Sequence, residues 1–185
     1  MVYNLAVNIK LNAKQLRKGL GSRVKGISKK QEIYIILDNV LDTYNIGSIF
    51  RLADAVAAKK IYLCGGSEIP PNPRIKKASI NTTEVVEWEY APDAVGVIKN
   101  LKFKIKNLQV VAVEQVKSSV PYYQFEYTLP LALVVGHESD GVSKEVLKMA
   151  DAVVELPMFG INKSLNVMVS LGIVLYEVLE KVILR

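Results

Sequence analysis

Short apolar runs rich in β-branched residues recur along the chain, and segments with helical periodicity separate them. The clearest runs are residues 33–37 (IYIIL) and 131–135 (LALVV), neither of which contains a charged side chain. A strand that is apolar at every position is buried on both faces, which is typical of a parallel sheet covered by helices on both sides. We therefore predict an α/β fold in which a mostly parallel sheet has helices on both faces.

The remaining elements continue this alternation within 185 residues, a length that suits one domain with one sizeable core. Residues 65–73 (GGSEIPPNP) are predicted to form a loop, because their prolines interrupt regular structure. Neither an internal repeat nor a second domain is visible. Further strands are predicted at 60–64, 84–88, 109–114 and 152–156, and helices at 46–58, 91–102, 143–150 and 164–185.

The last predicted helix is the most apolar segment of the chain. Residues 167–176 are almost wholly apolar, but Glu177, Glu180 and Lys181 follow them at once. The apolar run is therefore too short to span a bilayer, and we expect no membrane association. A helix that is apolar on most of its surface is buried on more than one side. We expect it to pack against both the sheet and a partner subunit.

Positive charge is concentrated in a basic N-terminal arm, residues 1–31, and residues 32–185 form the predicted α/β domain. The arm contributes +8 and no acidic residue, while the whole chain has a net charge of +6. Such a patch favours a polyanion, most simply nucleic acid; the alternative is a solvated arm without a partner. The candidate residues for binding nucleic acid are Lys10, Lys14, Arg17, Lys18, Arg23, Lys25, Lys29 and Lys30.

Several familiar kinds of site are excluded by the residue counts and by missing motifs. A single cysteine, Cys64, and a single histidine, His137, exclude an intramolecular disulfide, a multi-cysteine zinc site and any mechanism that needs two imidazoles. No glycine-rich dinucleotide or phosphate-binding motif and no nucleophile elbow is present. We therefore expect no metal. Residues 1–20 lack the apolar stretch of a secretory signal, so a cytoplasmic setting is expected.

Ligands of open α/β sheets bind beyond the carboxyl ends of the strands, so the segments that follow each strand are informative. After the first strand, Asn45 is predicted to be a helix N-cap, and Gly47 and Arg51 lie one helical turn apart. Gly47 would leave room for a bulky group, and the guanidinium of Arg51 suits a phosphate or carboxylate. The alternative is an arginine paired with a local acid such as Asp54 or Glu138.

Two later strand ends carry further polar residues. Gly136 would permit close approach of a ligand, and Glu138 would either orient Arg51 or accept a hydrogen bond from a ligand; the alternative is a tight turn with a surface acid. Ser164 is predicted to be the N-cap of the last helix, with Asn166 in its first turn. The free amides there suit a polar or anionic group, although plain capping is the simpler alternative.

The three segments, taken together and in this order, resemble the SpoU (TrmH) family of RNA ribose 2′-O-methyltransferases of the SPOUT superfamily. One segment alone would be a weak match, whereas three in the correct order and strand context are specific. The motifs are N-x-G-x-x-x-R-x-A at Asn45, Gly47, Arg51 and Ala53; G-x-E-x-x-G-[VL]-S at Gly136, Glu138, Gly141, Val142 and Ser143; and P-M-x-G…S-L-N-V at Pro157, Met158, Gly160, Ser164, Leu165, Asn166 and Val167.

The resemblance implies a SPOUT fold with a C-terminal deep trefoil knot, S-adenosylmethionine bound in the knot, and a homodimer that acts on tRNA or rRNA. Ser139 is a small departure from the family pattern, in which glycine is common at this position. Many relatives carry an N-terminal RNA-binding domain, for which this chain has too few residues, so RNA capture would depend on the basic arm, the catalytic domain and a second subunit.

The family's site residues transfer to this chain through the matching motifs. The implied catalytic residues are Arg51, Asn45, Glu138, Asn166 and Ser164, and the implied cofactor-binding residues are Val135, Gly136, Leu156, Met158, Ser164, Leu165 and Val167. A guanidinium stays protonated in proteins, so we expect Arg51 to hold an RNA phosphate and to stabilise the developing alkoxide rather than to abstract a proton. The alternative function is that of a catalytically silent RNA-binding relative.

Overall fold

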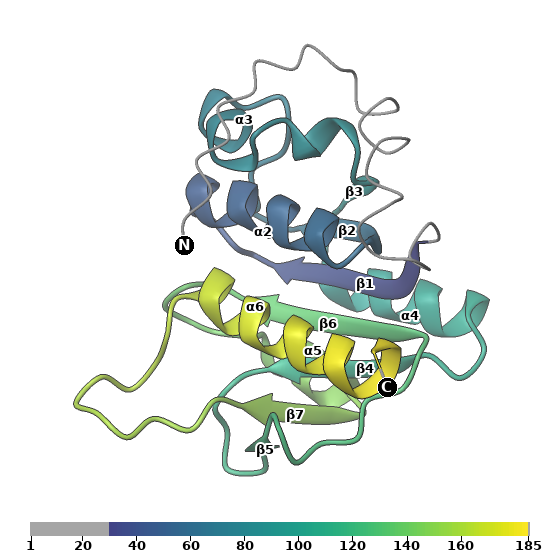
Figure 1. The fold of residues 1–185 in the computed structure, drawn as a ribbon, viewed down its shortest axis with the longest axis vertical. Coiled ribbons are helices and arrows are strands. Elements are labelled where there is room, and N and C mark those ends of the chain that lie inside the picture. Colours follow the sequence, from purple (N-terminus) through teal and green to yellow (C-terminus); the bar gives the residue numbers. More distant parts are fainter. Residues whose placement is uncertain (1–29, 185) are drawn as a thin grey trace.

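A computed structural model of the chain describes residues 30–184. Their centre is a seven-stranded sheet with the order β3-β2-β1-β6-β4-β7-β5 (Figure 1). Every pairing between these strands is parallel, which confirms the predicted sheet. The strands are β1 (Gln31–Asp38), β2 (Ala58–Cys64), β3 (Trp88–Ala91), β4 (Gln109–Val113), β5 (Val120–Pro121), β6 (Leu131–Gly136) and β7 (Ala152–Glu155).

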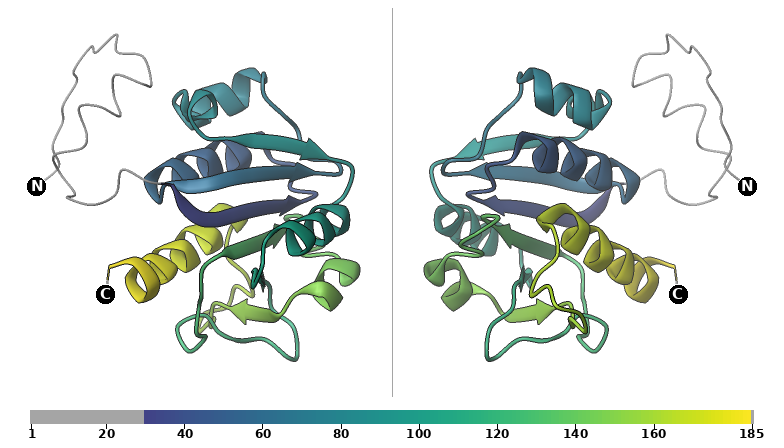
Figure 2. Two further views of the ribbon diagram at one scale, coloured as in Figure 1. Left: turned by 90° about the vertical axis from the view of Figure 1, so that its right-hand side faces the viewer. Right: turned by 90° about the vertical axis from the view of Figure 1, so that its left-hand side faces the viewer.

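Helices cover both faces of the sheet, as predicted for strands without a polar face (Figure 2). The helices are α2 (Thr43–Ala55), α3 (Pro73–Ser79), α4 (Ala94–Lys104), α5 (Lys144–Met149) and α6 (Val167–Val178), with a 3₁₀ turn at Thr82–Glu84 and a π-helical turn at Leu179–Ile183. Among the described residues, no helix is both long and apolar enough to cross a membrane.

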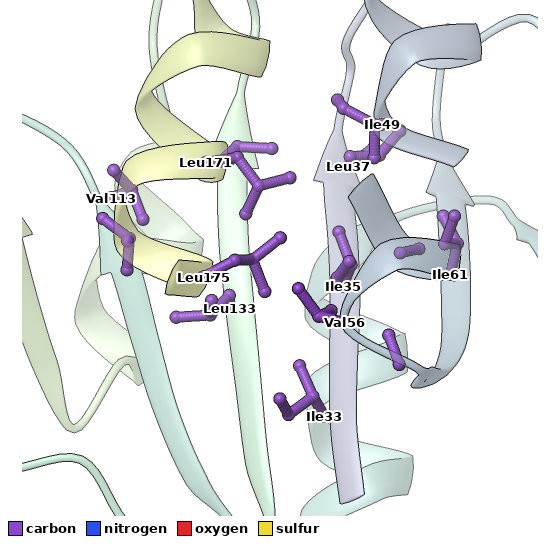
Figure 3. Packing of buried hydrophobic residues seen from close by; sticks show 14 of the residues in the cluster. Ile33, Ile35, Leu37, Ile49, Val56, Ile61, Val113, Leu133, Leu171 and Leu175 are labelled. Atoms are coloured by element: carbon purple, nitrogen blue, oxygen red, sulfur yellow. The ribbon is translucent and has the colours of Figure 1, made fainter. Parts of the chain in front are cut away.

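Two hydrophobic cores lie on opposite faces of the sheet, because alternate residues of each strand point in opposite directions. In β1, Ile35 belongs to the core beneath α2 and α6, and Ile36 to the core beneath α4 and α5. Figure 3 shows Leu171 and Leu175 of α6 packed beside Leu133 of β6. The long helix therefore covers the middle of the sheet, directly beside the strands whose ends carry the motifs found in the sequence.

Several element boundaries differ from the prediction, and each difference has a local cause. β3 begins at Trp88 and α4 at Ala94, because β3 is a half-exposed edge strand without an apolar run to mark it. Helix α3 and the two-residue strand β5 were not predicted. α6 begins at Val167 rather than at residue 164. Of the predicted RNA-binding arm, only Lys30 lies among the described residues; Lys10, Lys14, Arg17, Lys18, Arg23, Lys25 and Lys29 lie outside them.

Candidate active site

The carboxyl ends of four neighbouring strands meet at one edge of the sheet. Asp38 at the end of β1 is level with Gly136 at the end of β6, and β4 and β7 end beside them. The loops that follow these strands enclose a cavity of about 440 Å³. It is lined by Val113, Glu114, Gln115, Val135, Gly136, His137, Glu138, Ser139, Gly141, Glu155, Leu156, Met158, Ser164, Leu165, Asn166, Val167 and Ser170.

The cavity brings together residues that are up to 57 positions apart in the chain. All seven residues predicted to bind the cofactor line it, as do the predicted catalytic residues Glu138, Ser164 and Asn166, whereas Asn45 and Arg51 lie outside its lining. Glu114 and Gln115 were missed by the sequence analysis. The signal that could have found them is their position directly after a buried strand, the same rule that identified the other three segments.

A chain of hydrogen bonds links the three motifs. Asn45 Nδ2 donates to Glu138 Oε1 over 3.0 Å, and Asn166 Nδ2 donates to Asn45 Oδ1 over 2.9 Å. The side chain of Asn45 is buried, so both of its polar ends are satisfied by residues distant in sequence. The backbone N–H of Met168 donates to Asn166 Oδ1 over 2.9 Å. The network fixes the start of α6 against α2 and against the loop after β6.

Both predicted helix caps are wrong. The N-cap of α2 is Asp42, whose carboxylate accepts from the backbone N–H groups of Tyr44 and Asn45 over 2.7 and 3.1 Å. The N-cap of α6 is Asn166, and Ser164 lies in the exposed loop before it. In both cases a nearby polar residue is the N-cap instead. Because Asp42 caps α2, the side chain of Asn45 can bridge the other two motifs.

The room beside Gly47 is filled by protein, which corrects its predicted use by a ligand. A Cβ atom at Gly47 would lie 2.6 Å from Ala78 Cβ and 2.7 Å from the carbonyl oxygen of Ile75, both in α3. Glycine is therefore needed for α3 to pack this closely on α2. The prediction failed because α3 itself was not recognised.

The loop after β6 is held by backbone contacts. A Cβ at Gly136 would lie 2.2 Å from the carbonyl carbon and oxygen of Gly141 and 2.3 Å from the nitrogen of Val142. His137 and Gly141 exchange two backbone hydrogen bonds, of 3.1 and 2.9 Å. Glu114 Oε2 accepts from the N–H of Val142 over 2.8 Å. Gly136 thus permits the chain to approach itself, and the resulting turn shapes one wall of the cavity.

Arg51 is exposed on α2, and its guanidinium makes no hydrogen bond or ion pair with any residue among 30–184. The predicted alternatives, a pairing with Asp54 or an orienting contact from Glu138, are therefore not observed. Glu138 instead accepts from Asn45 and from the backbone N–H groups of Leu41 and Asp42, over 3.1 and 3.0 Å. Within residues 30–184, no polar partner occupies the guanidinium of Arg51.

Two opposing effects act on the carboxyl group of Glu138. Partial burial raises its pKa, but the hydrogen bonds from Asn45, Asp42 and Leu41 together outweigh burial and hold the pKa below its ordinary value of 4.5. The carboxylate is therefore ionised at neutral pH. Because the pKa is lower in the folded protein than in the unfolded chain, this carboxylate stabilises the fold above about pH 4.5. That contribution is lost as the pH falls through the lowered pKa.

Replacing Glu138 by glutamine is expected to remove this carboxylate's contribution to the pH dependence of stability. At pH 7 the thermal midpoint should fall by about 1–3 °C, a small shift because solvent screens the carboxylate. At pH 3 the wild type and Glu138→Gln should converge. Thermal unfolding followed by circular dichroism between pH 3 and 7 measures both. Glu126→Gln is the control, since that exposed side chain contacts no described partner; an equal shift there would contradict the prediction.

The cavity suits S-adenosylmethionine. Its volume lies within the range of small-molecule sites. Apolar walls from Val135, Leu156 and Leu165 suit a flat heterocycle, and backbone groups of the loops supply hydrogen-bond partners. The carboxylates of Glu114 and Glu155 give the cavity negative charge, which is compatible with a sulfonium cation.

Comparisons with known proteins agree with this arrangement. The family model described as the SpoU rRNA Methylase family matches residues 32–176. A tRNA (guanosine(18)-2′-O)-methyltransferase from Aquifex aeolicus is 36% identical over 168 residues, which cover 89% of this chain and 74% of the relative. A 23S rRNA (guanosine-2′-O-)-methyltransferase, RlmB, from Vibrio parahaemolyticus is 30% identical, with 80% and 59% covered. The chain therefore spans between three fifths and three quarters of these two relatives.

Solved structures give the same result. The A. aeolicus TrmH/SpoU tRNA modifying enzyme superposes with a TM-score of 0.72 at 32% identity, over 83% of this chain and 76% of that one. An AdoMet-bound rRNA methyltransferase from Sinorhizobium meliloti superposes with a TM-score of 0.74 at 29% identity, over 82% and 57%. The sheet order, the motif residues gathered at one sheet edge and these matches lead to one conclusion: the chain belongs to the SpoU methylase family.

Proposed function

We propose that this chain transfers the methyl group of S-adenosylmethionine to a ribose 2′-hydroxyl of a tRNA or rRNA. The observation that carries the proposal is the hydrogen-bonded chain Glu138–Asn45–Asn166, which joins the cavity to the helix that presents Arg51. The relatives named above as tRNA and rRNA 2′-O-methyltransferases support the same reaction.

The reaction needs alignment and charge stabilisation more than a strong base. When bound, the cofactor supplies an already activated methyl group, so the chain has to position the hydroxyl oxygen in line with it. A carbon–sulfur bond breaks and a carbon–oxygen bond forms, while the hydroxyl proton leaves to an RNA phosphate or to water. The protonated guanidinium of Arg51 would hold that phosphate and stabilise the developing alkoxide.

A homodimer is part of the proposal, as is a cytoplasmic site of action. The outer side of α6 exposes Val169 and Tyr176, 39% and 55% accessible in the single chain, on a helix that already covers the sheet with its other side. A second copy would cover these apolar side chains.

The basic arm stays a predicted RNA-binding segment. Its residue Lys30 pairs with Glu87 over 2.7 Å and is therefore less available to RNA than the prediction supposed.

Two measurements on the full chain test the function. Calorimetric titration with S-adenosylhomocysteine should show one site per chain or per two chains, and Asn166→Ala should bind at least about tenfold more weakly because the start of α6 loses its cap and its link to Asn45. Incubation with S-adenosylmethionine and unmodified RNA, followed by nuclease digestion and mass spectrometry, should yield a 2′-O-methylated nucleoside. A base-methylated product would refute the proposal, and cofactor binding without any methylation would indicate the silent relative.

A further inference from the structure

Helix α3 carries three exposed cations that have no acidic partner among residues 30–184. Arg74, Lys76 and Lys77 make no side-chain hydrogen bond or ion pair within the described part of the chain. Between residues 65 and 80 the only acidic residue is Glu68. The basic arm carries a charge of +8 and the whole chain +6, so the residues after the arm are slightly acidic together. The positive charge of α3 is a local exception to this.

The helix that carries these cations is firmly held. Asn72 caps it by accepting from the N–H groups of Arg74 and Ile75 over 2.9 and 3.3 Å, and Pro73 occupies its first turn. Ile75 is fully buried beneath it. Figure 1 shows α3 against α2, where Gly47 allows the two backbones to touch. The three cations are therefore presented on a rigid support, at little further cost in backbone entropy when a ligand binds.

The contact between α2 and α3 also positions Arg51 relative to these cations. Arg51 lies four residues, about 6 Å of rise, beyond Gly47 in α2, and Arg74 lies four residues before Ala78 in α3. Gly47 lies against Ala78 where the two helices pack, so Arg51 and Arg74 each lie about one helical turn from this contact. Tyr44, 52% exposed, stands three residues before Gly47 on the same side of α2.

We propose that this surface, the exposed side chains of α3 together with Tyr44 and Arg51 of α2, binds the sugar–phosphate backbone of the RNA beside the nucleotide to be methylated. Unpaired guanidinium and ammonium groups complement phosphates, and an exposed aromatic ring provides a stacking surface for an unpaired base. The inference rests on the proposed function and adds to it a binding surface on the catalytic domain itself, separate from the N-terminal arm. Contacts of this kind raise affinity and set orientation without reading the base sequence.

The test compares two triple variants of the full chain that lose the same charge. One is Arg74→Gln/Lys76→Gln/Lys77→Gln on α3. The matched control is Lys99→Gln/Lys104→Gln/Lys106→Gln, three exposed cations on or just after α4, which covers the opposite face of the sheet. The dissociation constant for an unmodified tRNA transcript is measured for wild type and both variants at several salt concentrations.

The α3 variant should bind the RNA about tenfold more weakly at low salt. The plot of log affinity against log salt should become less steep by about 2–3, roughly one for each lost phosphate contact. The α4 variant should change the slope by less than about 0.5. An unchanged slope in the α3 variant, or equal changes in both variants, would overturn the proposal; the first result would point to a protein partner for this surface instead.

Binding of S-adenosylhomocysteine separates this inference from the function on which it rests. All three proteins should bind the cofactor product equally, because no altered residue lines the cavity. If wild type binds neither S-adenosylhomocysteine nor RNA, the proposed function fails and the surface fails with it. If the cofactor product binds equally but the α3 variant keeps wild-type RNA affinity, only the assignment of the surface is wrong.

Discussion

Replacing Arg51 by lysine is expected to lower the single-turnover rate of methyl transfer by about 100-fold or more, the usual effect of removing one well-placed donor to a developing oxyanion. Lysine keeps the positive charge but lacks the planar fork that can hold a phosphate through two parallel hydrogen bonds. The rate is measured with enzyme in excess over an unmodified RNA transcript at saturating S-adenosylmethionine. A rate near that of wild type would contradict the role assigned to the guanidinium.

Stability provides the control for this experiment. Arg51 is exposed, and its guanidinium makes no hydrogen bond or ion pair with a described residue, so Arg51→Lys should change the free energy of unfolding by no more than about 0.5 kcal/mol. Cofactor affinity should also be retained, because Arg51 lies outside the cavity lining. Lys104→Gln, a single exposed cation on α4, should leave the rate within about twofold. A loss of rate with unchanged stability and cofactor affinity therefore isolates the chemical step.

Gly136→Ala is expected to have the second large effect, a loss of about 1–3 kcal/mol in the free energy of unfolding, as for overpacking, together with at least about tenfold weaker binding of S-adenosylhomocysteine. The added methyl group would meet backbone atoms of Gly141 and Val142 at 2.2–2.3 Å. Val142 is itself tied to Glu114, so the turn has to deform and the wall of the cavity moves with it. Chemical denaturation and calorimetric titration measure the two losses.

Gly96→Ala in α4 is the matched control for this substitution. A methyl group there would come no closer than 3.4 Å to Asp93, an ordinary contact, and alanine favours the helix. The variant should be as stable as wild type or up to about 1 kcal/mol more stable, with unchanged cofactor affinity. If Gly136→Ala behaves in the same way, the close approach between the two segments of the loop is not needed for the cavity.

The sequence alone was sufficient for the α/β class, for most strands and for many residues of the cavity, although Glu114 and Gln115 were missed. Runs such as 131–135 are apolar at every position, and only burial on both faces explains that pattern. The segments after these strands converge because the strands are parallel, which follows from the class itself. Every residue predicted to bind the cofactor accordingly lines the cavity, although its contact with the cofactor stays a prediction, as does the trefoil knot.

Tertiary structure alone decided what individual polar residues and glycines do. Whether Asn45 caps its helix or bridges Glu138 and Asn166 depends on groups 93 and 121 positions away, and local propensity contains no information about them. Gly47 has space on one side in an isolated helix, and only the docking of α3 fills that space. Hydrophobic periodicity is a local property that survives in the sequence, whereas hydrogen-bond partners and close contacts are set by which strands become neighbours in the folded sheet.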